Sequence, residues 1–459
     1  MPARGPLCGR GRGVAILDET TLDEVDDIPG EIEPDEDSPA EKGPRDRAFN
    51  PWRYAASATA KAIIAEAVHM VEGYEDHRAP RTRKRKADDQ RTFEATIAAV
   101  LCDLINHELV GFPKGIHITR SKQVLSVGNR HKAPALNSKL PDLLDKLATP
   151  ELDYIRLTSG HRATFGVAKR TTMKPGPRLL DRISQSAIKP ADFGQYLHND
   201  VIFLREPKTD PMVKPKLVTY VDTPQTDLFR TQMRTINSWL MEAETGFEPG
   251  LLTGKPIAVD TRQRMLRRIF SRGKFTSGGR LWGGFWMQLT KRQREEALFI
   301  DQDEIVELDY GQMAPRLFYA IKGLQPPDKD LYAIPGYEQH REGIKKVMNS
   351  MFFAVKPITK MPRGVRKKFA EQHRITDVVA AITDYHPDIA DLFHRGLGHE
   401  AQFTESQIMI DILLTLKDMD IVALPIHDAI LVAASNEDEA QDVMLNVFKA
   451  RTGMDGSVD

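Results

Sequence analysis

Residues 305–320 have the sequence IVELDYGQMAPRLFYA, and this stretch decides the fold of the chain around it. The apolar residues before Asp309 predict a buried strand that ends at this carboxylate. Tyr310–Gly311 predict a turn, and residues 316–318 predict the start of a helix. Mg²⁺ is commonly held by one or two carboxylates together with substrate phosphates, and a strand end suits such a carboxylate. A second interpretation is that Asp309 only caps the following helix.

The composition limits the classes of protein to be considered. With 459 residues, the chain is long enough for two to four domains with substantial cores. The two cysteines, Cys8 and Cys102, do not provide a disulfide framework and fit a reducing, cytoplasmic compartment. The sequence has neither a run of 18 apolar residues nor a signal-peptide core, so we expect no membrane partner and no secretion.

The net charge of −1 conceals two segments of opposite sign. Residues 18–41 contain twelve acidic side chains and no Lys or Arg, so the rest of the chain carries +11. Residues 1–45 lack apolar periodicity and predict a disordered acidic tail. A basic body with an acidic tail favours a polyanionic partner.

A basic cluster lies between two predicted helices, 50–75 and 92–110. Its members are Arg78, Arg81, Arg83, Lys84, Arg85 and Lys86. Such a cluster could neutralise several phosphates of a nucleic acid. It could equally be a solvated linker, and the sequence leaves both interpretations open.

Short β-like runs alternate with Pro, Gly and Lys through residues 115–220, and no motif there indicates a reaction. A helix then begins near Thr223–Pro224 and continues to about Glu244. Leu228 belongs to its predicted apolar stripe, whereas Arg230 and Arg234 lie off that stripe, where a phosphate backbone or only solvent would meet them.

Three later segments carry chemistry. Residues 272–288, RGKFTSGGRLWGGFWMQ, combine glycines that permit close approach with aromatic stacking faces and cations, although a structural turn is also possible. Residues 337–355 predict a helix with Arg341 and Lys345 one turn apart, which suits a triphosphate or a solvated cationic stripe. Residues 421–433, IVALPIHDAILVA, predict a β-hairpin that presents Asp428 at its turn.

Taken in order, these segments resemble the family A (DNA polymerase I-like) DNA polymerases and the related single-subunit phage-type RNA polymerases. FTSGGRLWGGFWMQL resembles the TGRLSS…LQNIP stretch of the family, and LDYGQMAPRL resembles motif A, DYSQIELR. The pattern R-x3-K-x7-F resembles motif B, and IHDAILV resembles motif C, VHDE. The resemblance covers roughly residues 260–459.

The resemblance implies an α+β right-hand polymerase with a palm sheet, helical fingers and a thumb-like region, plus an N-terminal extension. The expected parts are a tail at 1–45, a basic accessory region at 46–180, a thumb-like helical region at 181–260, and palm and fingers at 261–459.

The resemblance also implies the roles of individual residues. Asp309 and Asp428 would be catalytic and would hold two Mg²⁺ ions, with the Tyr310 carbonyl assisting one of them. Arg341 and Lys345 would bind the triphosphate, and Phe353 would lie against the nascent base pair. The nucleotide site would also include Gln312, Ala314 and Asn349. The residues expected at the primer–template duplex are Arg280, Gln288 and His427.

Departures from the family pattern change the expected activity. Ala314 replaces the motif A glutamate that blocks a ribose 2′-hydroxyl, and Phe353 replaces its partner tyrosine. We therefore expect weak discrimination against ribonucleotides. Asn349 replaces an aromatic residue, and Ala429 replaces the acid that often follows HD. The 36 residues from Asp309 to Lys345 and the 83 from Lys345 to Asp428 predict compact fingers.

The function expected from the resemblance is DNA-directed DNA synthesis on a primer–template from nucleoside triphosphates. We expect no proofreading, because no exonuclease domain is recognisable upstream. The alternatives are RNA or primer synthesis by the same site, a catalytically silent nucleic-acid-binding replication protein, and a Mg²⁺-dependent nuclease, which would not explain Arg341 and Lys345. A compact enzyme of this kind suits a phage or plasmid, with replication proteins as possible partners of the N-terminal region.

Overall fold

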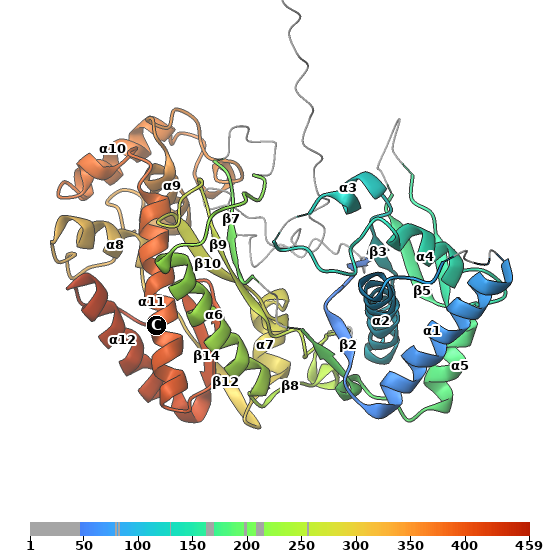
Figure 1. Cartoon of the computed structure of the whole chain (residues 1–459). Coiled ribbons are helices and arrows are strands. Elements are labelled where there is room, and N and C mark those ends of the chain that lie inside the picture. The colour runs from blue at the N-terminus through green and yellow to red at the C-terminus, as the bar shows by residue number, and fades with distance from the viewer. Residues whose placement is uncertain are drawn as a thin grey trace, which may run out of the picture. The chain divides into compact units, whose positions relative to one another are not determined.

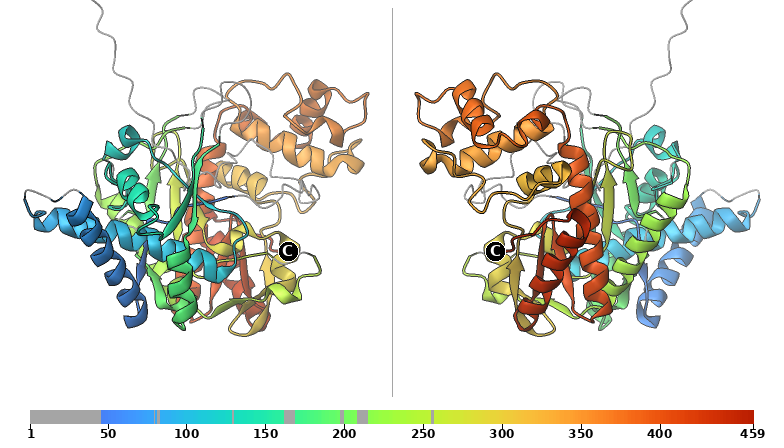
Figure 2. Two further views of the ribbon diagram at one scale, coloured as in Figure 1. Left: turned by 90° about the vertical axis from the view of Figure 1, so that its right-hand side faces the viewer. Right: turned by 90° about the vertical axis from the view of Figure 1, so that its left-hand side faces the viewer.

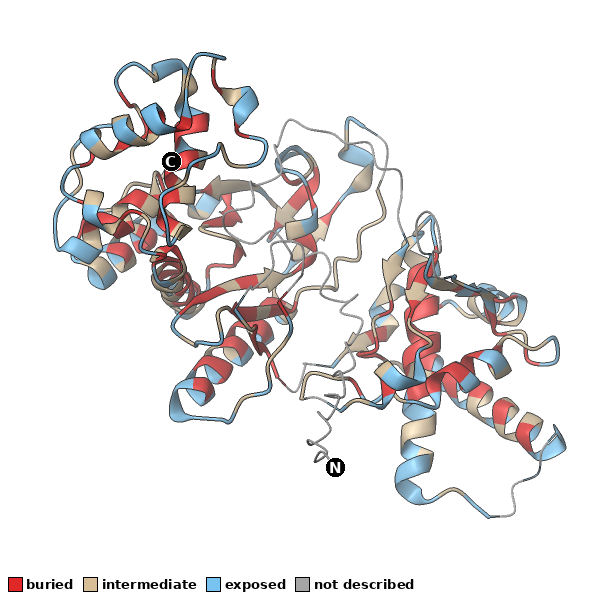
Figure 3. Ribbon diagram, turned by 90° about the horizontal axis from the view of Figure 1, so that it is seen from above, coloured by how far each residue is buried: buried red, intermediate tan, exposed pale blue. Residues whose placement is uncertain are grey.

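The computed structural model describes residues 46–78, 80, 83–128, 130–161, 169–196, 200–207, 215–254 and 257–459. The expected acidic tail at 1–45 and Arg81 of the basic cluster lie outside these residues. The chain is a mixed α+β protein that divides into two compact units, with the boundary between residues 198 and 199 (Figure 1). In each unit the buried residues lie along the strands and the inward helix faces (Figure 3).

The first unit is built from four principal helices, a short helix and small sheets. Its elements are β1 (Arg47–Ala48), β2 (Arg53–Ala55), α1 (Ala58–Arg78), α2 (Ala87–Val110), β3 (Ile116–Ile118), α3 (Lys122–Ser126), α4 (Leu140–Leu147), β4 (Ile155–Thr158), β5 (Thr171–Pro175), α5 (Pro177–Gln185), η1 (Pro190–Asp192) and β6 (Phe193–Gln195). The helix predicted at 92–110 is confirmed as α2, which begins earlier, at Ala87; the helix predicted at 50–75 is confirmed as α1 from Ala58 onward, whereas its first residues were wrongly predicted, because Arg53–Ala55 form β2. The β-like region beyond them also contains α3, α4 and α5, which the alternation of short runs did not indicate.

Helix α2 is the centre of the first unit, because its residues 96–107 are almost all buried. A four-stranded sheet in the order β1-β3-β5-β4 lies beside it. Asp103 of α2 is fully buried and accepts hydrogen bonds from Arg47 and Arg53, so its charge is paired. Burial among apolar neighbours raises the pKa of the Cys102 thiol to about 12, and Cys102 is therefore an unreactive core residue.

The second unit contains the segments singled out in the sequence. Its elements are β7 (Ile202–Leu204), α6 (Pro224–Glu242), β8 (Thr245–Phe247), η2 (Pro249–Leu251), β9 (Leu266–Phe270), β10 (Gly278–Gly283), η3 (Phe285–Gln288), α7 (Lys291–Ala297), β11 (Leu298–Ile300), β12 (Asp303–Leu308), α8 (Met313–Lys322), η4 (Glu338–His340), α9 (Arg341–Phe353), η5 (Arg366–Lys368), α10 (Ile375–Tyr385), η6 (Ala390–Leu392), α11 (Gly398–Asp418), β13 (Ala423–Ile426), β14 (Ala429–Ala433), η7 (Ala434–Asn436) and α12 (Glu437–Thr452).

A five-stranded antiparallel sheet in the order β13-β14-β12-β11-β8 organises the second unit. The expected strand ending at Asp309, the helix after it and the hairpin around His427–Asp428 are confirmed as β12, α8 and β13–β14. Helices α11 and α12 lie side by side and contribute to the same core as the sheet (Figure 2). Four apolar residues of α8 and four of α12 are buried there.

A second sheet, in the order β10-β9-β7, carries helix α6. The prediction that Leu228 belongs to the buried apolar stripe of α6 is wrong, because its side chain is 55% exposed. The next residue, Phe229, is buried against Phe270 instead. Arg230 is also buried, because ion pairs with acidic residues, including Asp222 and Asp227, hold its guanidinium against the unit. It is therefore not the exposed cation that the pattern predicted.

The boundary between the two units differs from the domain boundary that was expected between residues 180 and 181. Helix α5 spans that position, and β6 pairs with β2 of the first unit, so the first unit continues beyond residue 190. The interval 181–260, expected to be a thumb-like region, is divided between the two units. Its longest helix, α6, lies against β7 and β9, and β8 joins the edge of the five-stranded sheet.

Candidate active site at the ends of two paired strands

Asp309 lies at the end of β12, the strand that pairs with β14 of the β13–β14 hairpin. Leu308 is buried as the last residue of β12, and Asp309 directly after it is exposed. The strand pairs with β14 along residues 305–308, up to Asp309, and with β11 at residues 303–304. The carboxylate of Asp309 is therefore attached to a rigid base and faces solvent.

Asp428 reaches the same end of the sheet from the β13–β14 hairpin. Ile426 pairs with Ala429 across a two-residue turn, and His427 in that turn has a φ of 56°. Leu308 pairs with Ile430, so extending this register by one residue places Asp309 level with Ala429, the neighbour of Asp428. Adjacent strands lie about 4.8 Å apart, so both acids emerge at the same end of the sheet.

The last described residues fix the backbone at Asp309. Its amide donates to the carbonyl of Asp459 at 3.2 Å, and the amide of Asp459 donates back at 2.9 Å. Tyr310 and Val458 form the adjoining pair, and the Tyr310 carbonyl takes no part in these hydrogen bonds. A Cβ at Gly311 would lie 2.9 Å from the Ser457 hydroxyl and 3.1 Å from an Asp459 carboxylate oxygen, so a larger residue would have to displace these side chains.

The side chain of Tyr310 has a structural role. Its hydroxyl donates to the carbonyl of Met444 in α12 at 2.6 Å, and burial raises its pKa. Only the backbone of Tyr310 is thus available to a ligand.

Two further residues of this region were not singled out in the sequence. Arg316 donates through Nε to the Gly311 carbonyl at 3.0 Å and through Nη1 to the Asp455 carbonyl at 3.3 Å. Arg316 and the Asp459 carboxylate lie beside the turn after Asp309, because residues 457–459 pair with residues 309–311, some 150 residues earlier in the chain. No local pattern signals such pairing.

Strand β10 brings Arg280 to helix α11. The guanidinium of Arg280 donates to both carboxylate oxygens of Glu405, at 2.5 Å and 3.0 Å. Arg280 is 22% exposed and Glu405 is 7% exposed. This bidentate pair uses two of the donors that were expected to reach a duplex.

His427 packs edge-on against Trp282, with 4.9 Å between ring centroids. Burial, and then the positive charge of Arg280, lowers the pKa of His427 to about 4, although Asp428 opposes the shift. His427 is therefore neutral at neutral pH, and its Nδ1 has no hydrogen-bond partner among the described residues.

Gln288 ends η3 and is exposed, as a contact with a ligand requires. The neighbouring Trp286 is fully buried and donates from Nε1 to the Pro425 carbonyl at 2.9 Å. This bond ties η3 to β13, the first strand of the Asp428 hairpin.

Helix α9 carries the predicted triphosphate ligands. Arg341 is exposed and donates to both oxygens of Asp330, at 2.5 Å and 3.2 Å, and this pairing raises its pKa. Lys345, one turn further, is exposed and forms no ion pair with any described residue. The two cations thus differ, because Arg341 must leave Asp330 to bind an anion.

Two contacts attach α9 to the helix that follows Asp309. Phe318 of α8 stacks on Phe352 of α9 with 3.7 Å between centroids. The Oε1 atom of Gln312 accepts a hydrogen bond from the Leu331 amide at 2.6 Å. Gln312 therefore links the start of α8 to the loop that leads to α9, in addition to any contact with a nucleotide.

The remaining predicted nucleotide-site residues lie on α8 and α9. Ala314, in the first turn of α8, and Asn349 are half-buried. Phe353 is half-buried, packs edge-on against His399 at 4.9 Å, and occupies the space where a Cβ on Gly398 would lie. The basic cluster around residues 78–86 belongs to the first unit.

Comparison with known proteins adds no assignment: no protein-family model matches the chain, and no curated protein sequence matches it. Among the described residues, no group of three or more His, Cys, Asp or Glu side chains forms a metal-binding cluster. None of the helices in the described ranges is long and apolar enough to cross a bilayer.

Proposed function

We propose that the chain is a template-directed nucleotidyltransferase, most simply a DNA-directed DNA polymerase of the right-hand type. The observation that carries this proposal is that Asp309 and Asp428 emerge at the same end of paired strands, and that the helix with Arg341 and Lys345 packs against α8, the helix that follows Asp309. In this proposal the five-stranded sheet is the palm, and α9 and α10 belong to the fingers.

The residues present fit two Mg²⁺ ions. Asp309 is exposed at the end of β12, Asp428 lies in the turn of the hairpin whose strand β14 pairs with β12, and the Tyr310 carbonyl is left out of the pairing with Val458. Mg²⁺ keeps several waters and substrate phosphate oxygens, so two carboxylates and one carbonyl are sufficient protein ligands. Bound Mg²⁺ ions would lower the pKa of a primer 3′-hydroxyl and neutralise charge on the leaving pyrophosphate.

The residues of α9 orient the triphosphate. Lys345 supplies an exposed point charge, and Arg341 supplies a planar fork that exchanges Asp330 for phosphate oxygens. The ion pair with Asp330 holds Arg341, and with it the first turn of α9, in place before the nucleotide arrives. The phosphate then replaces Asp330 as the anion at Arg341, and the released Asp330 carboxylate, which is 33% exposed, is left to solvent.

The sugar preference follows from two missing polar groups. Ala314 and Phe353 offer neither a carboxylate nor a hydroxyl to a ribose 2′-position. This observation favours ribonucleotide incorporation as a second activity of the same site, including RNA or primer synthesis.

The test is primer extension with Mg²⁺ on a DNA template, with dNTPs and rNTPs compared at equal concentration. Asp309→Asn and Asp428→Asn should each reduce extension at least about 10³-fold while DNA binding persists, because the proposed catalysis requires both acids. Asp418→Asn, an exposed acid at the end of α11, is the matched control and should retain activity.

Extension that survives in either variant would refute the assigned site. Tight DNA binding without extension by the unmodified protein would favour the non-catalytic nucleic-acid-binding alternative.

A further inference from the structure

The first unit has the order of elements found in a winged helix. Helix α2 is followed by β3, α3, α4 and the β4–β5 hairpin, and the three strands lie in the order β3-β5-β4. Helix α4 then takes the place of the helix that reads bases in helix-turn-helix proteins. A winged helix can bind nucleic acids through one of its faces.

Helix α4 itself does not offer a surface for bases or phosphates. Its outward positions are Asp142 and Asp145, and both are exposed acids. Asp142 pairs with Lys122 at 2.7 Å, and Asp145 pairs with Arg120 at 2.6 Å. Lys122 of α3 and Arg120 just before it are engaged in these pairs, so this face carries no excess of positive charge for an anionic ligand.

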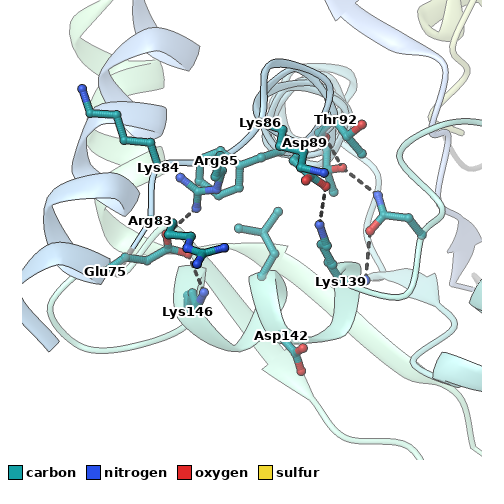
Figure 4. A pocket seen from close by; sticks show the side chains of 14 residues that line it. Glu75, Arg83, Lys84, Arg85, Lys86, Asp89, Thr92, Lys139, Asp142 and Lys146 are labelled. Atoms are coloured by element: carbon teal, nitrogen blue, oxygen red, sulfur yellow. Dashed lines mark hydrogen bonds and ion pairs between the residues drawn. The ribbon is translucent and has the colours of Figure 1, made fainter. Parts of the chain in front are cut away.

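A pocket of about 400 Å³ lies beside α4 and the N-terminus of α2 (Figure 4). Among the described residues, six cations and three acids contribute to its wall, which gives these residues a net charge of about +3. Thr92, Thr96 and Asn137 add neutral hydrogen-bonding groups. The pocket therefore suits an anion with several oxygen acceptors.

Half of the cations are held by the protein itself. Arg85 pairs with Glu75 and lies 3.7 Å from the centroid of the Phe93 ring. Lys146 pairs with Glu75 at 2.5 Å, and Lys139 pairs with Asp89 at 2.7 Å. The two pairs with Glu75 are the less exposed of the three, and Arg85 covers the Phe93 ring.

The other cations of the pocket remain available. Arg83, Lys84 and Lys86 are exposed, and none of them forms an ion pair with a described residue. Lys86 is also the N-cap of α2, where no side-chain cap satisfies the first amides of the helix. These amides are open to an anion, although Asp88 and Asp89 in the same turn already complement the helix dipole.

We propose that this pocket binds consecutive phosphate groups of a nucleotide or of a single nucleic-acid strand. Duplex DNA is too wide to enter a hollow of this size, whereas a single strand or its phosphorylated end fits. Because Arg85 covers Phe93, no aromatic face of the pocket is open to a base, and recognition is independent of sequence. The site belongs to the first unit, so it does not depend on the catalytic proposal.

The test uses the full chain in EDTA, which removes Mg²⁺ from any catalytic site. Binding of 3′-labelled oligodeoxythymidylate, with a 5′-phosphate or a 5′-hydroxyl, is measured by fluorescence anisotropy across a salt series. The variant Arg83→Gln/Lys86→Gln is compared with Lys61→Gln/Lys114→Gln, which removes equal charge from exposed positions of the same unit.

For the pocket variant we expect at least a tenfold loss of affinity. The slope of log K against log salt should fall by about 1.4, since each single-strand phosphate contact contributes about 0.7. A preference for the 5′-phosphate that the variant loses would identify a strand end. Equal loss for both oligonucleotides would identify internal phosphates, and displacement by tripolyphosphate would identify a free nucleotide tail.

Equal behaviour of the two double variants would overturn the proposal. So would a strong dependence of affinity on base composition that persists in the pocket variant. Retained oligonucleotide binding in Asp309→Asn, together with its loss in the pocket variant, separates this site from the catalytic one. Equal unfolding midpoints of both double variants establish that the comparison reports binding.

Discussion

Replacing Glu405 by Gln removes the negative half of the ion pair that holds Arg280 on α11. Breaking a fully buried pair costs about 3–5 kcal/mol, and an exposed pair contributes at most about 1 kcal/mol. Glu405 is 7% exposed and Arg280 is 22% exposed, which places this pair between the two cases. The Gln carbonyl still accepts one of the two hydrogen bonds, so we expect a loss of about 2 kcal/mol in the free energy of unfolding. For a unit of this size, that loss lowers the melting temperature by about 4–8 °C.

The variant should also bind nucleic acid more tightly. A released Arg280 can take one additional phosphate, which steepens the salt dependence of duplex affinity by about 0.9 in log K per log salt. Urea unfolding followed by tryptophan fluorescence measures the stability, with Trp282 and Trp286 as nearby reporters. Anisotropy with a labelled primer–template measures the affinity.

Glu400→Gln is the matched control, because Glu400 is exposed on the same helix. This control should change stability by less than about 0.5 kcal/mol. A Glu405→Gln protein as stable as the control, with unchanged duplex affinity, would refute the reasoning. The double variant Glu405→Gln/Arg280→Gln measures the coupling free energy between the two side chains. The second substitution should cost little stability once the first has been made.

Three further predictions concern buried groups. Burial lowers the pKa of His107 to about 4, so the first unit should lose about 3 kcal/mol as the pH falls from about 6.5 to 4, where the unfolded chain binds the proton and the folded one does not. Urea unfolding at several pH values checks this, and His107→Gln should flatten the dependence while exposed His69→Gln should not. Gly398→Ala places a Cβ 2.6 Å from the Phe353 ring and should cost about 1–3 kcal/mol in thermal unfolding; an equal cost in a Phe353→Ala background would contradict the steric cause. Asn237→Leu removes both buried hydrogen bonds to the backbone of β9 and should cost about 3 kcal/mol in urea unfolding, and unaltered amide exchange at the start of β9 would contradict it.

The local elements around Asp309 and Asp428 were predictable from the sequence. Alternating and continuous apolar runs with turn residues between them define β12, α8 and the β13–β14 hairpin, because strand and helix periodicity is a property of neighbouring residues. The same periodicity locates α9 and places Arg341 and Lys345 on one side of it. The order of these segments also suggested the family resemblance on which the catalytic proposal rests.

Periodicity alone predicted α6 less well. Leu228 fits an apolar stripe but is exposed, and Arg230 is buried because three acids neutralise it. A stripe pattern does not specify which neighbouring segments supply those acids. The neighbours that α6 meets in the fold therefore decide which of its faces is buried.

By itself, the sequence determined the α+β class, the strand-end carboxylates and the cationic helix. Only the tertiary structure decided that Arg280 is held by Glu405, 125 residues away, and that Ser457–Asp459 pairs with the Asp309 turn. It likewise decided that Arg78 pairs with Glu151 and Arg85 with Glu75, whereas other cations of the basic cluster remain for a ligand. The physical reason is that secondary structure follows from neighbours along the chain, whereas the partner of a charge or a strand edge is set by packing between distant segments.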